Sequence, residues 1–239
     1  MIVVGLLVAA GSGERLGAGA PKAFVGCAGR PLLEWSLDAL SAVCDRVVVA
    51  VPPELAGLER DRVAGAASRS GSVRAALRAA PEADIAIVHD AARPLLTSGL
   101  LERCLAALED GWDGVVAAAP VSDTIKETGP GRTRVVRTLP RRGLWAVQTP
   151  QVFRAEVLRA ALEADEATLA AASDDASLIE AAGGAVRVVE APAENLKVTG
   201  RLDLRVAEAL LREREGGAKS SRPDTGAGLC SSPTAAPRA

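Results

Sequence analysis

The chain of 239 residues contains few of the residue types that usually carry nucleophilic or metal chemistry. It has one histidine, four cysteines, one methionine and no tyrosine. The cysteines are scattered and form no CxxC pair, so we expect neither a disulfide framework nor a Cys/His zinc site. A Ser–His–Asp or Cys–His nucleophile would have to use His89, which ends an apolar run, and no GxSxG motif accompanies it. We therefore do not expect this kind of catalysis.

The chain also lacks long apolar runs and a surplus of charge of either sign. No run reaches 18 apolar residues, which argues against a membrane-spanning helix. The first residues carry no basic segment, and their apolar run leads into a glycine-rich loop, which is not typical of a signal peptide. The formal net charge of -2 leaves no basic excess for nucleic acid phosphates. These absences predict a cytoplasmic protein that binds neither membranes nor nucleic acids.

Lysine is the scarce basic residue, because only four of the 28 lysines and arginines are lysines. Arginine and alanine, both abundant here, have GC-rich codons, so genome composition explains most of this imbalance. A lysine that remains can mark a place where arginine would not serve, since an ammonium group is compact and a guanidinium is flat and bulky. The four positions are Lys22, Lys126, Lys197 and Lys219.

Hydrophobic periodicity predicts alternating strands and helices. Strands are expected at 2–9, 46–51, 84–88, 114–119, 146–152 and 185–189. Helices are expected at 31–40, 72–80, 100–108, 154–164, 174–182 and 201–214. This order predicts an α/β fold of Rossmann-like type, with a mostly parallel sheet and helices on both of its faces.

Two segments fall outside this pattern. Residues 121–144 are charged and threonine-rich, with a Gly129-Pro130-Gly131 turn at the middle, which predicts a hairpin. Its strands are too polar for the core, so we expect it to project as an arm. From residue 216 the chain is rich in Gly, Ser, Pro and Ala without periodicity, so we expect a disordered tail over 216–239 and a single domain over 1–215.

Chemistry is expected beyond the carboxyl ends of the strands, where open α/β sheets bind ligands. The loop from Gly11 offers backbone N–H groups for a phosphate chain, and Arg15 and Lys22 add cations. A dinucleotide site fits poorly, because Leu16 replaces the third glycine of that fingerprint and no acid ends the second strand; no Walker A motif occurs. Asp90 ends the third strand, where it can bind Mg²⁺ together with substrate phosphates, cap the next segment or pair with Arg93.

Several motifs occur together in a fixed order over residues 2–210. They are AAGSGERLG (9–17), PK (21–22), RSGSV (69–73), VHDAARP (88–94), PVSDTIK (120–126), RRGLW (141–145), QTPQ (148–151), SDDAS (173–177) and NLKVT (195–199). With these motifs the chain resembles the 2-C-methyl-D-erythritol 4-phosphate cytidylyltransferases of the non-mevalonate isoprenoid pathway. The pair VHDAARP and QTPQ is specific, whereas the glycine-rich loop marks only the wider nucleotidyltransferase superfamily.

The resemblance implies a fold of the nucleotide-diphospho-sugar transferase type and a defined reaction. CTP and 2-C-methyl-D-erythritol 4-phosphate would give 4-diphosphocytidyl-2-C-methyl-D-erythritol and pyrophosphate, with Mg²⁺ as cofactor and no protein nucleophile. It also implies a homodimer that clasps through the 121–144 arm. Alternatives are the same chemistry on another polyol phosphate such as ribitol 5-phosphate, a non-catalytic nucleotide-binding protein, and a dehydrogenase.

The resemblance also implies roles for individual residues. Lys22 and Lys197 would flank the α-phosphate, Arg15 would hold the leaving pyrophosphate, and Asp90 would bind Mg²⁺ and the nucleotide. The other nucleotide-binding residues would be Ala9, Ala10, Gly11, Ser12, Gly13, Gly65 and Ser72. The residues binding the polyol phosphate would be Arg93, Thr124, Arg141 and Ser173, with Thr124 and Arg141 reaching into the neighbouring subunit.

Three positions depart from the family pattern. Ala23 stands where glutamine usually follows Pro-Lys, and Pro140 stands where an aspartate often precedes the arm-base arginine. Gly65-Ala66 replaces a Gly-Gly pair ahead of the motif that contains Ser72. Because alanine resists a positive φ, this last change puts the conformation of the base-binding loop in question.

Overall fold

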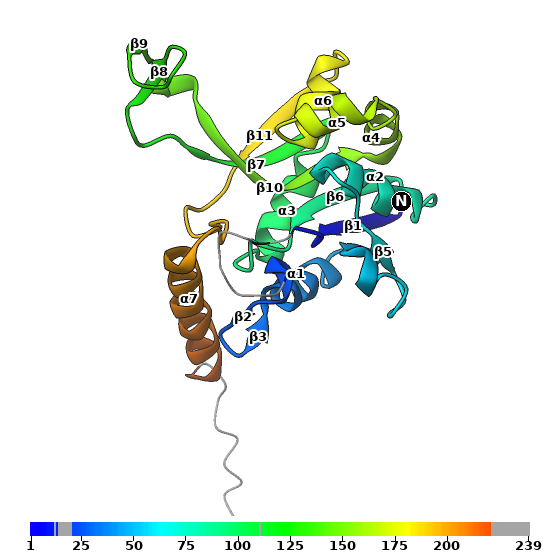
Figure 1. The fold of residues 1–239 in the computed structure, drawn as a ribbon. Coiled ribbons are helices and arrows are strands. Elements are labelled where there is room, and N and C mark those ends of the chain that lie inside the picture. Colours follow the sequence, from blue (N-terminus) through cyan, green and yellow to red (C-terminus); the bar gives the residue numbers. More distant parts are fainter. Residues whose placement is uncertain (12, 14–20, 110, 221–239) are drawn as a thin grey trace, which may run out of the picture.

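The computed structural model describes residues 1–11, 13, 21–109 and 111–220, with side chains as far as residue 216. Within these ranges a seven-stranded sheet has the order β11-β7-β10-β6-β1-β4-β5 (Figure 1). Its strands are β1 (Val3–Val8), β4 (Arg46–Val51), β5 (Arg62–Ala64), β6 (Ile85–Asp90), β7 (Gly114–Pro120), β10 (Trp145–Arg154) and β11 (Val186–Glu190). β10 runs antiparallel to both of its neighbours, and the other pairs are parallel. The mostly parallel sheet is therefore confirmed.

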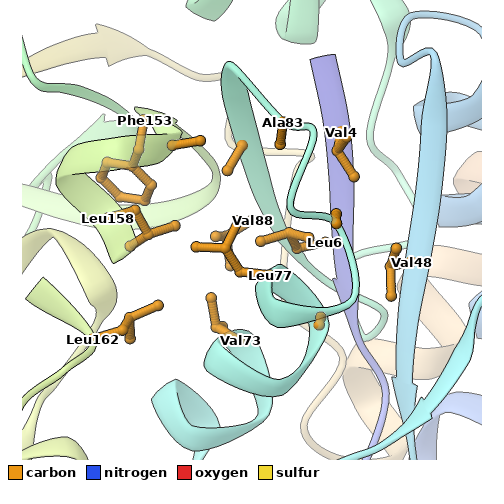
Figure 2. Packing of buried hydrophobic residues seen from close by; sticks show 14 of the residues in the cluster. Val4, Leu6, Val48, Val73, Leu77, Ala83, Val88, Phe153, Leu158 and Leu162 are labelled. Atoms are coloured by element: carbon orange, nitrogen blue, oxygen red, sulfur yellow. The ribbon is translucent and has the colours of Figure 1, made fainter. Parts of the chain in front are cut away.

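Helices cover both faces of this sheet, as expected. They are α1 (Leu32–Ser41), α2 (Arg69–Arg78), α3 (Ser98–Ala106), α4 (Ala155–Ala161), α5 (Glu166–Ala171) and α6 (Asp175–Ala181). The last helix, α7 (Arg201–Ser220), packs instead in a separate apolar cluster with Cys27 and with Leu32 of α1. Alternate residues of each strand point to opposite faces. Leu6 of β1 packs with α2 and α4 on one face (Figure 2), and Leu7 packs with α1 and α3 on the other.

The predicted arm is a separate two-stranded antiparallel sheet of β8 (Ile125–Thr128) and β9 (Val135–Leu139). Figure 1 shows it extending away from the main sheet. At its base β10 begins at Trp145 and pairs there with Pro120 of β7, so the two strands continue past the core toward the arm. The strand expected at 146–152 is found at 145–154, with an exposed first part near the arm and a buried second part in the core.

Several boundaries differ from the sequence expectations. α2 begins at Arg69 rather than residue 72, because the hydroxyl of Ser68 caps the N–H of Gly71. The hairpin of β2 (Gly26–Cys27) and β3 (Arg30–Pro31), the short β5 and helix α5 were not predicted. α7 continues to Ser220, so the expectation of disorder from residue 216 is wrong for residues 216–220, because helical hydrogen bonding propagates past Gly216. Residues 221–239 lie outside the described residues.

Candidate active site

A cavity of about 750 Å³ opens where the carboxyl ends of β1, β4 and β6 meet. Its described lining comes from the segment after β1, the start of α2, the end of β6 and the segments around Lys22 and Lys197. These residues are Val8, Ala9, Ala10, Gly11, Gly13, Lys22, Ala23, Ala66, Ala67, Ser68, Arg69, Ser72, Asp90, Ala91, Ala92, Lys197 and Thr199. Segments far apart in the sequence therefore converge at the edge where a ligand is expected.

The glycine-rich loop packs directly against Lys22. The N–H of Lys22 donates to the carbonyl of Gly11 at 3.3 Å. Gly13 has a φ of +73°, and a Cβ placed on it would lie 2.6 Å from the Cβ of Lys22. Position 13 therefore requires glycine for its backbone conformation and for this close approach. Lys22 opens the short 3-10 helix Lys22–Phe24, with Pro21 before it, and so stands at the cavity wall.

A second wall of the cavity is formed by the segment from Ala66 to Ser72, which follows Gly65. A Cβ on Gly65 would lie 2.3 Å from the Cβ of Ala10, so the glycine lets this segment approach the end of β1. The Ser72 hydroxyl accepts the N–H of Ala66 at 2.9 Å and donates to the carbonyl of Ser68 at 3.0 Å. These bonds fix the loop that faces the cavity.

The Gly-to-Ala departure at position 66 introduces no backbone strain. Among the described non-glycine residues, positive φ values occur at Ala28, Asp61 and Arg132. Ala66 therefore has an ordinary backbone conformation, and the doubt raised by its sequence is resolved. Its methyl group lies beside Gly71, where an added Cβ would approach it to 2.9 Å, so the neighbouring glycine makes room for it.

Asp90, at the end of β6, forms two ion pairs at the cavity. Its carboxylate accepts from Lys197 Nζ at 2.6 Å and from Arg69 Nε at 3.0 Å. Burial alone would raise the pKa of Asp90, but the charges of Arg69 and Lys197 outweigh burial and hold that pKa well below its usual range. Asp90 is thus a carboxylate at neutral pH. The expected alternative, an ion pair with Arg93, is wrong.

Arg69 was not singled out from the sequence, although it stands in the RSGSV motif. It is the first residue of α2 and it lines the cavity. Its Nη1 donates at 2.5 Å to the carboxylate of Asp175, which is fully buried at the start of α6. Only the motif itself could have drawn attention to Arg69, because its two partners are 21 and 106 residues away in the chain.

His89 lies behind the cavity and is fully buried. Thr149 Oγ1 accepts the N–H of Asp90 at 3.1 Å, so its own hydrogen is free for His89 Nδ1 at 3.0 Å. The proton of His89 then resides on Nε2, which lies 3.2 Å from the carbonyl of Arg93. Burial lowers the pKa of His89 to about 4, so the ring is neutral and both of its nitrogens are engaged. This arrangement is structural rather than nucleophilic.

Four residues expected at the polyol phosphate lie away from the described cavity lining. Arg93 is buried in the wall and donates to the carbonyl of Asn195 at 2.8 Å. Thr124, Arg141 and Ser173 are exposed or partly exposed, and Arg141 donates to the carbonyl of Ser122 near the base of the arm. Two further candidates, Ser12 and Arg15, lie outside the described residues. The nucleotide side of the predicted site is thus brought together, and the polyol side is not.

Comparison with known proteins gives a consistent result. A family model described as IspD, 2-C-methyl-D-erythritol 4-phosphate cytidylyltransferase, matches residues 2–213. A curated relative with that name from Nocardia farcinica is 45% identical over 223 residues, which cover 89% of this chain and 95% of the relative. One from Deinococcus radiodurans is 44% identical over 216 residues, covering 89% and 90%. The matched region contains all the described residues that line the cavity.

Solved structures show the same similarity. The crystal structure of 2-C-methyl-D-erythritol 4-phosphate cytidylyltransferase from Thermus thermophilus superposes with a TM-score of 0.74 at 38% identity, covering 89% of this chain and 100% of that chain. The enzyme of the same name from Francisella tularensis gives 0.74 at 26% identity, covering 87% and 99%. Both sequence and fold are therefore shared with these proteins.

Proposed function

The chain belongs to the family of 2-C-methyl-D-erythritol 4-phosphate cytidylyltransferases, which are CTP-dependent nucleotidyltransferases, and we propose that its cavity is where CMP passes from CTP to the polyol phosphate. One observation carries the proposal. Lys22, Asp90 and Lys197 come from three distant segments and line one cavity with the loop after β1. Two lysines beside a phosphate-binding loop can offset the negative charge of two phosphates that react with each other.

The reaction needs no protein nucleophile. An oxygen of the substrate phosphate attacks the α-phosphorus of CTP, the bond from that phosphorus to the bridging oxygen breaks, and pyrophosphate leaves. Because both reactants are anions, the barrier falls mainly through charge stabilisation and positioning. Lys22 and Lys197 supply positive charge at the α-phosphate. Arg15, outside the described residues, is proposed from the family resemblance to hold the pyrophosphate.

The nucleotide is bound mainly by backbone groups. Ala9, Ala10 and Gly11 follow β1 on one wall of the cavity, and the segment around Ser72 forms the facing wall. Gly65 sets the separation of the two walls, because it allows contact with Ala10. The remaining nucleotide-binding residues of this proposal are Ser12, which is not described, and Gly13, which packs on Lys22.

The donor set fits a divalent metal that arrives together with the nucleotide. Among the described lining residues, Asp90 is the one with a carboxylate, and no group of three or more metal-ligating side chains occurs in the described chain. Mg²⁺ commonly takes one or two carboxylates and completes its shell with substrate phosphates and water. We propose that Asp90, ionised as described above, holds the metal. Mg²⁺ would neutralise part of the charge on the phosphates.

The arm is proposed to complete the site in a homodimer. Its exposed apolar side chains, and those of the adjoining strand β10, need a partner surface: Val135, Val136, Trp145 and Val147 are 39–61% exposed. A second copy placed there would let Thr124 and Arg141 reach the substrate phosphate in the neighbouring cavity, with Ser173 beside it. Arg93 would act from behind the wall, because its contact with the Asn195 carbonyl holds the segment that carries Lys197.

A cytoplasmic location is also proposed. None of the described helices is both long and apolar enough to cross a membrane. The described cysteines, Cys27, Cys44 and Cys104, are free thiols, which suits a reducing compartment. Burial raises the pKa of Cys27 to about 11, so this thiol is not a candidate nucleophile.

The substrate assignment is tested by pyrophosphate release. Purified protein is supplied with CTP and Mg²⁺ and with either 2-C-methyl-D-erythritol 4-phosphate or ribitol 5-phosphate. We expect turnover with the first, as the names of the relatives favour, and slower turnover with the second. Faster turnover of ribitol 5-phosphate would overturn the substrate. Binding of CTP without pyrophosphate release from either compound would support a non-catalytic protein.

A further inference from the structure

A row of alternating charges begins at the cavity and runs into the core. Lys197 Nζ lies 2.6 Å from Asp90, Asp90 lies 3.0 Å from Arg69 Nε, and Arg69 Nη1 lies 2.5 Å from Asp175. The four residues come from the segment before α7, the end of β6, the start of α2 and the start of α6. The first two belong to the proposed reaction machinery. The last two have no role in it so far.

Arg69 is held between two carboxylates in a fixed orientation. One edge of its planar guanidinium faces Asp90 and another nitrogen faces Asp175, so rotation of the side chain would break both ion pairs. Arg69 therefore connects the strand that ends in Asp90 to helix α6. An ammonium group in its place could not present two separated donors in one plane.

Asp175 is itself held firmly. Its side chain is fully buried, and it occupies the first turn of α6, where the helix dipole favours a negative charge. The preceding Asp174 caps the helix through the N–H of Ser177 and accepts from Gln151 of β10 at 2.7 Å, which fixes the helix start on the sheet. Within the described part of the chain, Oδ1 of Asp175 has no hydrogen-bond partner. Burying a carboxylate with an unpaired oxygen costs free energy, even with Arg69 as its ion-pair partner. This cost indicates that Asp175 has a role beyond packing.

We propose that Arg69 and Asp175 are positioning residues for Asp90. Asp175 fixes the guanidinium of Arg69, and Arg69 fixes the rotation of the Asp90 carboxylate. The other oxygen of Asp90, which pairs with Lys197, is then held at the cavity that we propose binds the nucleotide and its metal. This inference rests on the proposed role of Asp90. It assigns the pair an effect on Mg²⁺–CTP binding and none on the polyol phosphate.

The test removes both members of the pair, so that neither Arg69 nor Asp175 is left without the other, and Asp90 keeps its ion pair with Lys197. In the Arg69→Met/Asp175→Leu variant both partners become apolar, which proteins often tolerate, whereas removing one partner strands the other. The matched control is Arg74→Met/Glu166→Leu. Arg74 of α2 and Glu166 of α5 form another ion pair, which does not involve Asp90. Asp175→Asn, which keeps the side-chain volume, serves if the double variant does not fold by circular dichroism.

Mg²⁺–CTP binding is measured by calorimetry without the polyol phosphate, so that no turnover occurs. We expect affinity to fall about 10- to 100-fold in the Arg69/Asp175 variant, as for other partners that orient a metal ligand, and not in the control. The KM of the polyol phosphate in the pyrophosphate assay should be unchanged. Equal affinity in the pair variant and the control would overturn the inference.

The Asp90→Asn variant separates failure of this inference from failure of the proposed function. If Asp90→Asn binds Mg²⁺–CTP as tightly as the unchanged protein, the proposed role of Asp90 is wrong, and the inference falls with it. If Asp90→Asn weakens binding and loss of the pair does not, only the positioning role is overturned. In an Asp90→Asn background, removal of the pair should have no further effect. An additional loss there would show that Arg69 contacts the nucleotide itself.

Discussion

The wall of the cavity and the arm are built on opposite principles. At the wall, Asp90 is buried, both of its carboxylate oxygens are paired, and it bonds to residues from three separate segments, Arg69, Thr149 and Lys197. On the arm, Thr124 and Arg141 are exposed, and the hairpin touches the sheet only through its base (Figure 1). The nucleotide half of the proposed site is therefore assembled within one chain. The residues proposed to bind the polyol phosphate are present in the sequence, but within one chain they do not come together at a common surface.

This difference supports the proposal that a second copy completes the site at the arm. A polar hairpin that carries exposed Val135 and Val136, with exposed Trp145 on the adjoining strand β10, does not form a core of its own. Its apolar side chains are better explained by a partner than by solvent. We expect variants of the wall to act within one chain and variants of the arm to act across two, and the predictions below test this contrast.

The largest effect is expected at the two lysines of the wall. Lys22→Ala and Lys197→Ala should each lower kcat by about 10²- to 10³-fold, because each removes charge stabilisation at the reacting phosphates. The measurement is pyrophosphate release at saturating CTP and polyol phosphate. Activity close to that of the unchanged protein in either variant would show that the role is wrongly assigned.

The same positions test whether lysine scarcity has chemical meaning. Lys22→Arg and Lys197→Arg keep the charge but replace a compact ammonium by a planar group. We expect kcat to stay well below the normal value in both. Rates near normal would show that codon usage alone explains the small number of lysines. Lys126, which bonds to Thr138 across the arm, is the control for a lysine outside the cavity.

The next effect concerns the arm. Arg141→Ala should raise the KM of the polyol phosphate by about tenfold or more, since a charge-assisted hydrogen bond to phosphate is lost, and leave the KM of CTP unchanged. Mixing this variant with Lys22→Ala tests the cross-subunit arrangement. If the arm acts in the neighbouring cavity, half of a random mixture is mixed dimers with one intact site, so about a quarter of normal activity returns. No recovery after subunit exchange would contradict the arrangement.

The wall and the arm also differ in how far the sequence predicts them. The order of strands and helices follows from apolar periodicity, and the hairpin follows from its polar strands and central turn. Helix α5 was missed because Glu166–Ala171 is rich in alanine and has little apolar periodicity, and its start depends on the Asp165 side chain bonding to the N–H of Thr168. Such a cap is visible only with the backbone in place.

Side-chain partners were harder to predict than the elements. The position of Lys22 beside the loop and of Asp90 at a strand end predicted one site, the family resemblance added Lys197, and the structure brings all three to one cavity. Motif order did not indicate that Arg69 would bridge two carboxylates, because that requires the relative position of α2, β6 and α6. Arg93 was expected to face the substrate, but the carbonyl of Asn195 attracts its guanidinium into the wall. Long-range contacts of this kind leave no local pattern in the sequence.

A smaller effect is expected for Gly13→Ala. The added Cβ would meet the backbone and Cβ of Lys22 at 2.6–2.9 Å, at a φ that alanine rarely adopts, so Lys22 must shift. The substitution introduces strain of roughly 1 kcal/mol or more, which is relieved when Lys22 moves away from its position at the cavity. We therefore expect kcat to fall about tenfold. Gly29→Ala is the control, because Gly29 also has a positive φ but nothing lies within 4 Å of its added Cβ. It should lower stability and leave kcat unchanged.

The smallest expected effect is a pH dependence of the free energy of unfolding that comes from His89 behind the cavity wall and not from the arm. The pKa of buried His89 is lowered from 6.5 to about 4, so the unfolded chain takes up a proton between these values and the folded chain does not. Stability is then fully present above pH 6.5 and is lost as pH falls toward 4. Over the upper part of this range, down to about pH 5, the loss amounts to roughly 1 to 2 kcal/mol, which urea unfolding at the two ends can measure. His89→Gln should remove that part of the pH dependence. Glu127→Gln, in an exposed ion pair of the arm, should leave it intact, and an equal change in both variants would show that the wall is not its source.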